Sequence, residues 1–192
     1  MRRIRVALYG SYGHQIHRLL ANNRYGELVA VCRFDRNALP EPLKSNIAIR
    51  EYQTLGDLLK DEQVELVSLC SPHRGAQVQD AIRCLEAGKH VYAEKPCAQT
   101  EPDLDRIVRT ARQTRRQFHE MAGTAFEQPY VEMRRIVAAG ALGTVVQILA
   151  QKSYPYHDRR PQDESVDGGL TRQAAVHALR MVEHVGGVKV KK

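Results

Sequence analysis

The sequence predicts an α/β fold in which helices flank a doubly wound parallel sheet, followed by the start of a second, α+β domain. Three observations predict this fold. Apolar runs rich in β-forming residues recur along the first half of the chain, segments with helical spacing alternate with them, and glycines stand at several of the junctions. Because helices separate the strands, the strands are expected to be parallel and joined by right-handed crossovers.

The first strand, turn and helix follow one another directly in RVALYGSYGHQIHRLL, residues 5–20. β-Formers precede Gly10, and the apolar residues after Gly13 have helical spacing. This order is typical of a nucleotide-binding β-α-β unit, in which the N–H groups and dipole at the start of the helix attract a pyrophosphate. The Gly-x-Gly-x-x-Gly fingerprint is incomplete, because Tyr12 and Gln15 stand at its second and third glycine positions. A buried strand followed by an ordinary tight turn is the alternative interpretation.

The remaining strands follow in order. Buried strands are predicted at residues 27–34 (ELVAVCRF) and 64–70 (VELVSLC), and short strands at 47–52 and 90–93. One helix is predicted to begin at residue 55, before the strand at 64–70. Another is predicted after that strand and ends at Gly88. These elements make up a Rossmann-type sheet, which we assign to residues 1–124, and residues 125–192 are assigned to the second domain.

The end of the second strand carries two charged side chains of opposite sign. In dinucleotide-binding folds an acid at this place binds the ribose hydroxyls, whereas an arginine there can bind a 2′-phosphate. Arg33 in that position would favour the cofactor that carries a 2′-phosphate, and Asp35 would favour the cofactor that lacks this phosphate. A charged pair in a solvated loop is the third interpretation.

Composition limits the class of protein. The 192 residues suffice for one complete domain and part of another, and no apolar run is long enough to span a bilayer. No signal region precedes the first strand, so we predict a cytoplasmic protein without membrane contact. The four cysteines form no Cys-x-x-Cys pair and are expected to be reduced.

The net charge of +7 suits an anionic ligand. The arginine-rich stretch at residues 106–116 lacks interleaved aromatic residues, and we therefore interpret it as a solvated helix face and not as a nucleic-acid surface. His14 and His17 are spaced for one helix face, but no third ligand is spaced near them. No metal site is predicted.

The segment EAGKHVYAEKP, residues 86–96, together with the Gly10 turn and the strand end at Ser71 and Pro72, resembles the glucose-fructose oxidoreductase and inositol dehydrogenase (Gfo/Idh/MocA) family. Residues 133–143 (MRRIVAAGALG), a following strand at 144–152, and a helix that carries His177 resemble the family's entry into its second domain. The resemblance covers almost the whole chain.

The resemblance implies an NAD- or NADP-dependent dehydrogenase that acts on the CH–OH group of a sugar, a polyol or a related small molecule. It places Lys95 beside the nicotinamide, where the ammonium group would polarise the substrate oxygen, and makes His177 the acid/base, with Gln173 beside it. Pro96 would fix the turn after Lys95. The candidate cofactor-binding residues are Gly10, Ser11, Tyr12, Gly13, His14, Gln15, Arg33, Asp35, Ser71, Pro72, His73, Glu94 and Lys95.

Three positions depart from the family pattern. Gln173 stands where the family often has aspartate, Arg180 replaces a second common aspartate, and Ala76 replaces a histidine. Gln173 can donate and accept hydrogen bonds, but it cannot carry a proton. A non-catalytic nucleotide-binding or interaction protein derived from this family is therefore the alternative function.

The end of the chain, Val188-Lys-Val-Lys-Lys192, alternates apolar and basic residues like the beginning of a strand. Family members continue through several further strands that line the substrate pocket and commonly build an oligomer interface. We therefore expect a second domain that is incomplete, mobile or completed by another chain, with a homo-oligomer as one outcome. An apolar face of Val145, Ile148 and Ala150 would then be exposed.

Overall fold

The computed structural model describes residues 2–123, 126–155, 157–158, 161 and 163–191. The chain divides into two compact units, Met1–Met121 (unit 1) and Ala122–Lys192 (unit 2). The boundary expected from the sequence, between residues 124 and 125, lies outside the described residues. No helix in the described part of the chain has the length and apolar character needed to cross a membrane.

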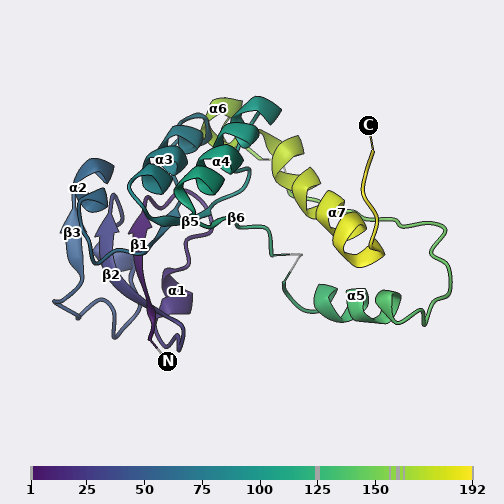
Figure 1. Ribbon diagram of the computed structural model, residues 1–192, viewed down its shortest axis with the longest axis horizontal. Coiled ribbons are helices and arrows are strands. Elements are labelled where there is room, and N and C mark those ends of the chain that lie inside the picture. Colours follow the sequence, from purple (N-terminus) through teal and green to yellow (C-terminus); the bar gives the residue numbers. More distant parts are fainter. Residues whose placement is uncertain (1, 124–125, 156, 159–160, 162, 192) are drawn as a thin grey trace. The chain divides into compact units, whose positions relative to one another are not determined.

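Unit 1 is built on a six-stranded parallel sheet with the order β3-β2-β1-β4-β5-β6 (Figure 1). The order reverses between β1 and β4, and α/β folds bind ligands outside the carboxyl ends of the strands at such a point. The strands are β1 (Ile4–Tyr9), β2 (Gly26–Cys32), β3 (Arg50–Tyr52), β4 (Leu66–Leu69), β5 (His90–Ala93) and β6 (Phe118–Glu120). The doubly wound fold predicted from the sequence is confirmed.

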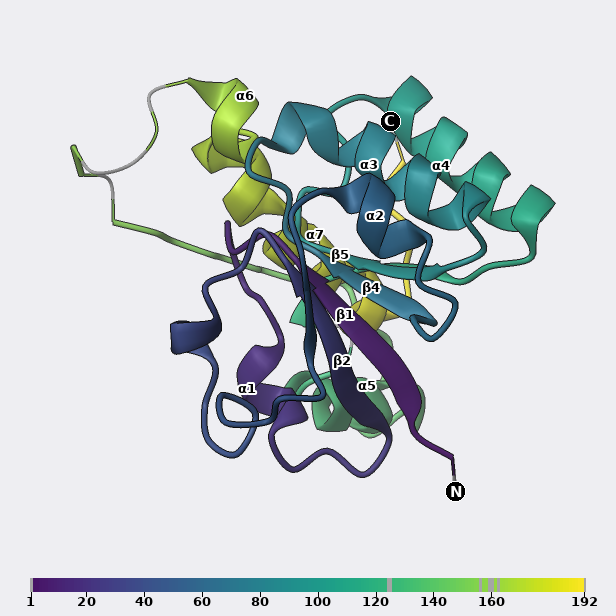
Figure 2. The same ribbon diagram turned by 90° about the vertical axis from the view of Figure 1, so that its left-hand side faces the viewer.

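One face of the sheet is covered by three helices, α2 (Leu55–Leu59), α3 (Arg74–Glu86) and α4 (Glu101–Thr114) (Figure 2). Thr54 and Thr100 begin α2 and α4, because each hydroxyl accepts a hydrogen bond from the N–H group three residues later. Leu58 and Ile107 from these helices are fully buried against the strands. This face holds the larger part of the core.

The opposite face has a thinner cover. It consists of α1 (His17–Leu20), the short 3-10 helix η1 (Arg36–Ala38) and a loop that contributes Leu39, Leu43 and Ile49 to the core. The expected helix after Gly13 is thus present, but it is only four residues long. The connection from β2 to β3 on this face contains η1 and the loop, but no α-helix.

The four cysteines are all free, as predicted, and all of them are buried. Burial raises the pKa of the Cys32 thiol to about 11 and that of Cys70 to about 12. Such thiols stay protonated near neutral pH and behave as small apolar side chains.

Unit 2 contains α5 (Tyr130–Ala138), α6 (Glu164–Asp167) and α7 (Leu170–Gly186) among its described residues. The helix around the predicted histidine is confirmed as α7. The strand predicted at residues 144–152 is wrong: this segment forms no strand, because no described neighbouring strand pairs with it.

The expected exposed face of this segment is also wrong. Val145, Ile148 and Ala150 are half-buried, whereas Val146 and Leu149 are 92% and 82% exposed. Ile148 lies against α7 so closely that a methyl group added to Gly186 would stand 2.1 Å from its Cδ1 atom. The segment therefore packs through single side chains instead of pairing its backbone.

Candidate active site

The turn after β1 is shaped by two glycines that face other parts of unit 1. Gly10 has φ +70°, and a Cβ atom there would stand 2.1 Å from the carbonyl oxygen of Cys70. Gly13 has φ +126°, and a Cβ atom there would stand 2.2 Å from Oε2 of Glu94. Both positions require glycine for conformation and for space. Ser11, Gly13 and His14 remain exposed, so a ligand can approach the backbone of this turn.

Gln15 fills the third position of the incomplete fingerprint, and its side chain is built into the scaffold. Its Nε2 group donates to the carbonyl oxygens of Tyr9, Gly10 and Ser68 at 3.2, 2.9 and 3.0 Å. Its Oε1 atom accepts from the Ser68 hydroxyl at 2.6 Å. Gln15 therefore ties the turn to β4 at the point where the strand order reverses, and the four-residue α1 contributes little dipole to this turn.

Glu94 joins the turn to the loop that carries Lys95. The Glu94 side chain is 1% exposed and accepts hydrogen bonds from the backbone N–H and the Nδ1 atom of His14, the latter at 2.9 Å. Its Oε1 atom accepts from the backbone N–H of Lys95 at 2.8 Å. Burial tends to raise the pKa of Glu94, but the hydrogen bonds from His14 and the charge of Arg74 prevail and lower this pKa below 4.5.

This carboxylate is expected to make the stability of unit 1 depend on pH in the acid range. A group whose pKa is lower in the folded state adds stability above its unfolded pKa, and this stability is lost as the pH falls through the folded pKa. We expect Glu94→Gln to reduce the free energy of unfolding by about 1–2 kcal/mol at neutral pH. The difference from the wild type should shrink as the pH falls below 4.5. Urea unfolding at several pH values measures it, with the exposed Glu62→Gln as control, and a difference that is independent of pH would contradict the assignment.

Arg74 forms a second connection between the turn and Lys95. It is 2% exposed, and its guanidinium donates to the carbonyl oxygens of Tyr12, Ser71 and Lys95 at 2.6, 3.2 and 3.3 Å. Gln77, also buried, accepts from Arg74 at 3.0 Å and donates to the carbonyl oxygen of Pro96 at 3.2 Å. These bonds satisfy backbone carbonyl groups in three loops, which lie outside the strands and have no partners in the sheet.

Sequence reasoning missed Arg74 and Gln77. A signal was present, because both fall on the helical stripe of α3 that continues through Val78 and Ala81 into the core. Polar residues on a buried stripe indicate groups that must find hydrogen-bond partners inside the protein.

Lys95 is the second residue after β5 and is 3% exposed. Its N–H group is held by Glu94 and its carbonyl oxygen by Arg74, and the Lys95–Pro96 peptide bond is cis. The predicted catalytic lysine therefore stands on backbone that is fixed from both sides and connected to the Gly10 turn.

The two charged candidates after β2, Arg33 and Asp35, have different surroundings in the structure. Asp35 begins η1, and its carboxylate accepts from the N–H group of Asn37 at 2.9 Å. Arg33 is exposed and has φ +49°, directly after the last residue of the strand. The carboxylate is thus used in a cap, and the cation is the side chain left at the strand end.

The predicted residues after β4 have mixed surroundings. Ser71 is fully buried, and its hydroxyl donates to Oδ2 of Asp80 at 2.8 Å. Pro72 is half-buried, and His73 is exposed at the start of α3 without a capping side-chain bond.

His17, considered with His14 as a metal ligand, instead packs its ring 5.2 Å from that of Phe34. Within the described residues, no group of three potential ligands is placed to hold a metal ion.

Unit 2 carries the other two predicted catalytic residues on α7. Gln173 and His177 lie one helical turn apart, and Nε2 of Gln173 donates to the carbonyl oxygen of Asp167 at 2.8 Å. The ring of Tyr154 stands 6.4 Å from that of His177, edge toward face. The catalytic set predicted from the sequence is therefore divided between the two units.

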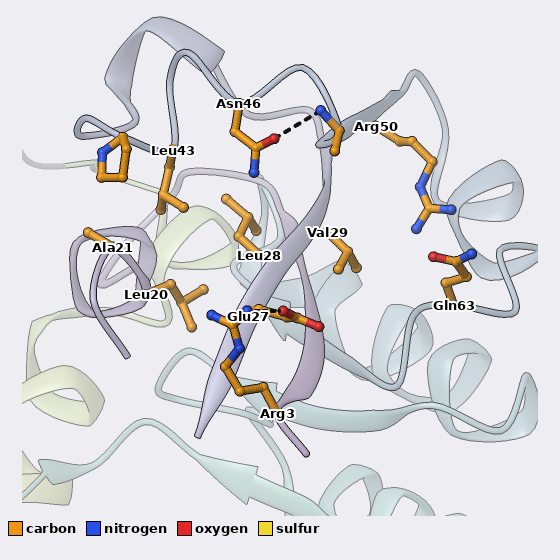
Figure 3. Close-up of a pocket in the computed structure, with 12 residues that line it drawn as sticks. Arg3, Leu20, Ala21, Glu27, Leu28, Val29, Leu43, Asn46, Arg50 and Gln63 are labelled. Atoms are coloured by element: carbon orange, nitrogen blue, oxygen red, sulfur yellow. Dashed lines mark hydrogen bonds and ion pairs between the residues drawn. The ribbon is translucent and has the colours of Figure 1, made fainter. Parts of the chain in front are cut away.

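A separate hollow of about 480 Å³ lies beside the amino-terminal half of β2 (Figure 3). Leu20, Leu28 and Leu43 line it, and an ion pair of 2.7 Å between Arg3 and Glu27 crosses its edge. Gly10 and Arg33 lie beyond the opposite, carboxyl ends of their strands. This hollow is consequently not part of the candidate site.

Comparison with known proteins agrees with the Rossmann-type sheet of unit 1. The model of an oxidoreductase family with an NAD-binding Rossmann fold matches residues 4–121. Inositol 2-dehydrogenase of Salmonella typhimurium is 28% identical over 173 residues, which cover 88% of this chain and 49% of that protein. D-xylose 1-dehydrogenase (NADP(+)) of Hypocrea jecorina is 26% identical over 144 residues, covering 69% of this chain and 37% of the relative. The chain thus spans about half the length of the inositol dehydrogenases that it matches.

Solved structures show the same fold. A 3-ketoreductase from Actinomadura kijaniata, in complex with NADP and TDP-benzene, aligns with a TM-score of 0.79 at 20% identity and covers 95% of this chain and 57% of that one. Myo-inositol 2-dehydrogenase from Lactobacillus plantarum aligns with a TM-score of 0.76 at 19% identity, with coverages of 97% and 57%. The family match over more than half of the chain confirms the resemblance and, at the level of the family, the nicotinamide dinucleotide cofactor. The chain belongs to the Gfo/Idh/MocA oxidoreductase family with an NAD-binding Rossmann fold.

Proposed function

We propose that the protein binds NAD or NADP along the Gly10 turn and oxidises or reduces a CH–OH carbon of a sugar, polyol or related small molecule. One observation carries the proposal: Glu94 and Arg74 fasten the glycine turn to the backbone of Lys95. A cofactor held on this turn is then held in a fixed relation to the lysine. When bound, the nicotinamide supplies the hydride acceptor or donor.

The residues of this chain have separate tasks in the proposal. The Lys95 ammonium polarises the substrate oxygen and favours alkoxide character. His177 exchanges the hydroxyl proton, since an imidazole titrates near neutral pH. Gln173 orients its neighbours by hydrogen bonds and moves no proton. The polyol and sugar class is supported by the names of the inositol and xylose dehydrogenases that resemble the chain.

A non-catalytic dinucleotide-binding protein is the second candidate. It is favoured by Gln173, whose amide is bonded to the carbonyl oxygen of Asp167, and by the absence of any strand among the described residues of unit 2. Such a protein would bind the dinucleotide on unit 1 and catalyse no reaction.

Titration of the full chain with NADH and with NADPH tests the proposal. The chain contains no tryptophan, so the fluorescence of the reduced nicotinamide can be followed with little protein emission. Saturable binding followed by turnover with a polyol supports the enzyme. Binding without turnover across a panel of polyols and sugars supports the second candidate, and no binding of either dinucleotide eliminates both.

Arg33 should favour the phosphorylated cofactor. We expect Arg33→Ala to weaken NADPH binding by about 10-fold or more while NADH binding changes little, because a 2′-phosphate loses a charge-assisted hydrogen bond. Calorimetric titration measures both constants. The control is Arg24→Ala, another exposed arginine just before β2, at the opposite end of the strand. Equal loss for both dinucleotides would refute the role of Arg33.

A further inference from the structure

An acidic side chain that the sequence did not single out lies at the same edge of the sheet as Arg33. Tyr9, the last residue of β1, pairs with Cys32 of β2 on one side and with Leu69 of β4 on the other. Arg33 is the first residue after Cys32 and Ser71 is the second residue after Leu69, so both lie just beyond the carboxyl ends of the strands that flank β1. Since neighbouring strands lie about 4.8 Å apart, the ends of β2 and β4 are on the order of 10 Å apart.

Asp80 of α3 is fixed at the β4 side of this edge. Its side chain is 13% exposed, and Oδ2 accepts the hydrogen bond of 2.8 Å from the buried Ser71 hydroxyl. Its Oδ1 atom lies 4.0 Å from Nη1 of Arg83, whose own side chain is 46% exposed. The carboxylate is held in place and retains acceptor capacity for a further donor.

The charges of Asp80 and Arg33 both act on the side chain of Tyr9, at the end of β1. Burial raises the pKa of Tyr9, the charge of Asp80 raises it further, and the charge of Arg33 lowers it. Asp35 is the second carboxylate near this edge, and its Oδ1 atom caps η1. The carboxyl ends of the strands thus carry Arg33 after β2 and, on the other side of β1, the Asp80 carboxylate with Arg83 beside it.

We propose that Asp80 is a specificity-determining residue that opposes Arg33 at the adenosine ribose of the dinucleotide. Its carboxylate accepts a hydrogen bond from a free ribose hydroxyl and repels a 2′-phosphate, so the preference between NAD and NADP is the balance of two side chains. The inference rests on the proposed function, since it requires a dinucleotide on the Gly10 turn.

Asp80→Asn tests this balance. A 2′-phosphate carries a charge of about −1.5 to −2, so loss of one nearby negative charge should raise the ratio of NADPH to NADH affinity by roughly 10-fold. Arg33→Ala should lower the same ratio, and the double variant should return toward the wild type. Glu86→Gln is the matched control, because it removes the same charge from the exposed carboxyl end of α3, away from the site. Circular dichroism verifies the fold, and Asp80→Ser replaces Asp80→Asn if the amide does not fold.

The outcomes are separable. An equal rise in Asp80→Asn and Glu86→Gln shows a general effect of net charge and overturns the inference, as does an unchanged ratio in a folded Asp80 variant. Wild-type protein that binds neither dinucleotide overturns the proposed function itself and this inference with it. A rise confined to the Asp80 variants supports the assignment.

Discussion

Gly10→Ala is expected to destabilise unit 1 by about 2–4 kcal/mol and to abolish dinucleotide binding. The added methyl group would stand 2.1 Å from the carbonyl oxygen of Cys70, and φ at this residue is +70°. A backbone oxygen at the end of a buried strand cannot move aside as a flexible side chain can, so the turn itself must shift. Urea unfolding followed by circular dichroism, with NADH titration of the same samples, measures both effects.

Gly88→Ala is the control that separates the two causes of the loss in Gly10→Ala, the close contact with Cys70 and the positive φ angle. Gly88 has φ +76°, but the nearest atom to an added Cβ is the Nη2 atom of Arg116 at an ordinary 3.5 Å. This variant should therefore lose only the conformational share, about 1 kcal/mol, and keep its affinity for NADH. If the two variants lose the same stability, the close approach to Cys70 has no energetic importance.

Lys95→Ala is expected to lower turnover by on the order of 100-fold or more, because the substrate oxygen loses the cation that favours its deprotonation. Dinucleotide affinity should change far less than turnover. The measurement is the appearance of reduced nicotinamide with the best substrate of a polyol and sugar panel. Lys60→Ala, which removes a lysine whose side chain is 79% exposed, is the control for net charge.

His177→Ala should have an effect of the same order on turnover, with dinucleotide affinity preserved. The control is His184→Ala, since His184 lies two helical turns further along α7 on nearly the same side of the helix. Unchanged turnover in His177→Ala would remove the catalytic assignment of this residue, and an equal loss in both variants would point to disruption of α7.

Periodicity predicted the strands of unit 1 well, because buried parallel strands are continuous apolar runs and each ends at a recognisable turn. It missed β6, where the three residues Phe118–Glu120 carry no distinctive pattern and pair only because β5 is beside them. The strand expected at residues 144–152 came from the family resemblance, and a resemblance carries over an element without showing whether a partner strand is present beside it.

The site was predicted as a set of residues but not as a set of contacts. Gly10 and Lys95 follow from local pattern and from family resemblance, whereas the bonds of Arg74 and Gln77 join loops that no spacing rule connects. Gln15 is predicted to bind the cofactor, and the structure adds that its side chain braces the turn. Local patterns locate turns, and only the packed chain shows which side chains the turns use for their own support.

The way the glycine turn is held has a consequence for the order of folding. Its supporting bonds connect residues far apart in the sequence: Gln15 to Ser68 spans 53 residues, Tyr12 to Arg74 spans 62, and His14 to Glu94 spans 80. Each closure carries an entropic cost that local contacts cannot offset, so these contacts are expected to form after β1 and β4 have come together. A nascent chain that has folded only its first strands would therefore contain the whole glycine sequence and still lack a turn shaped to hold a dinucleotide.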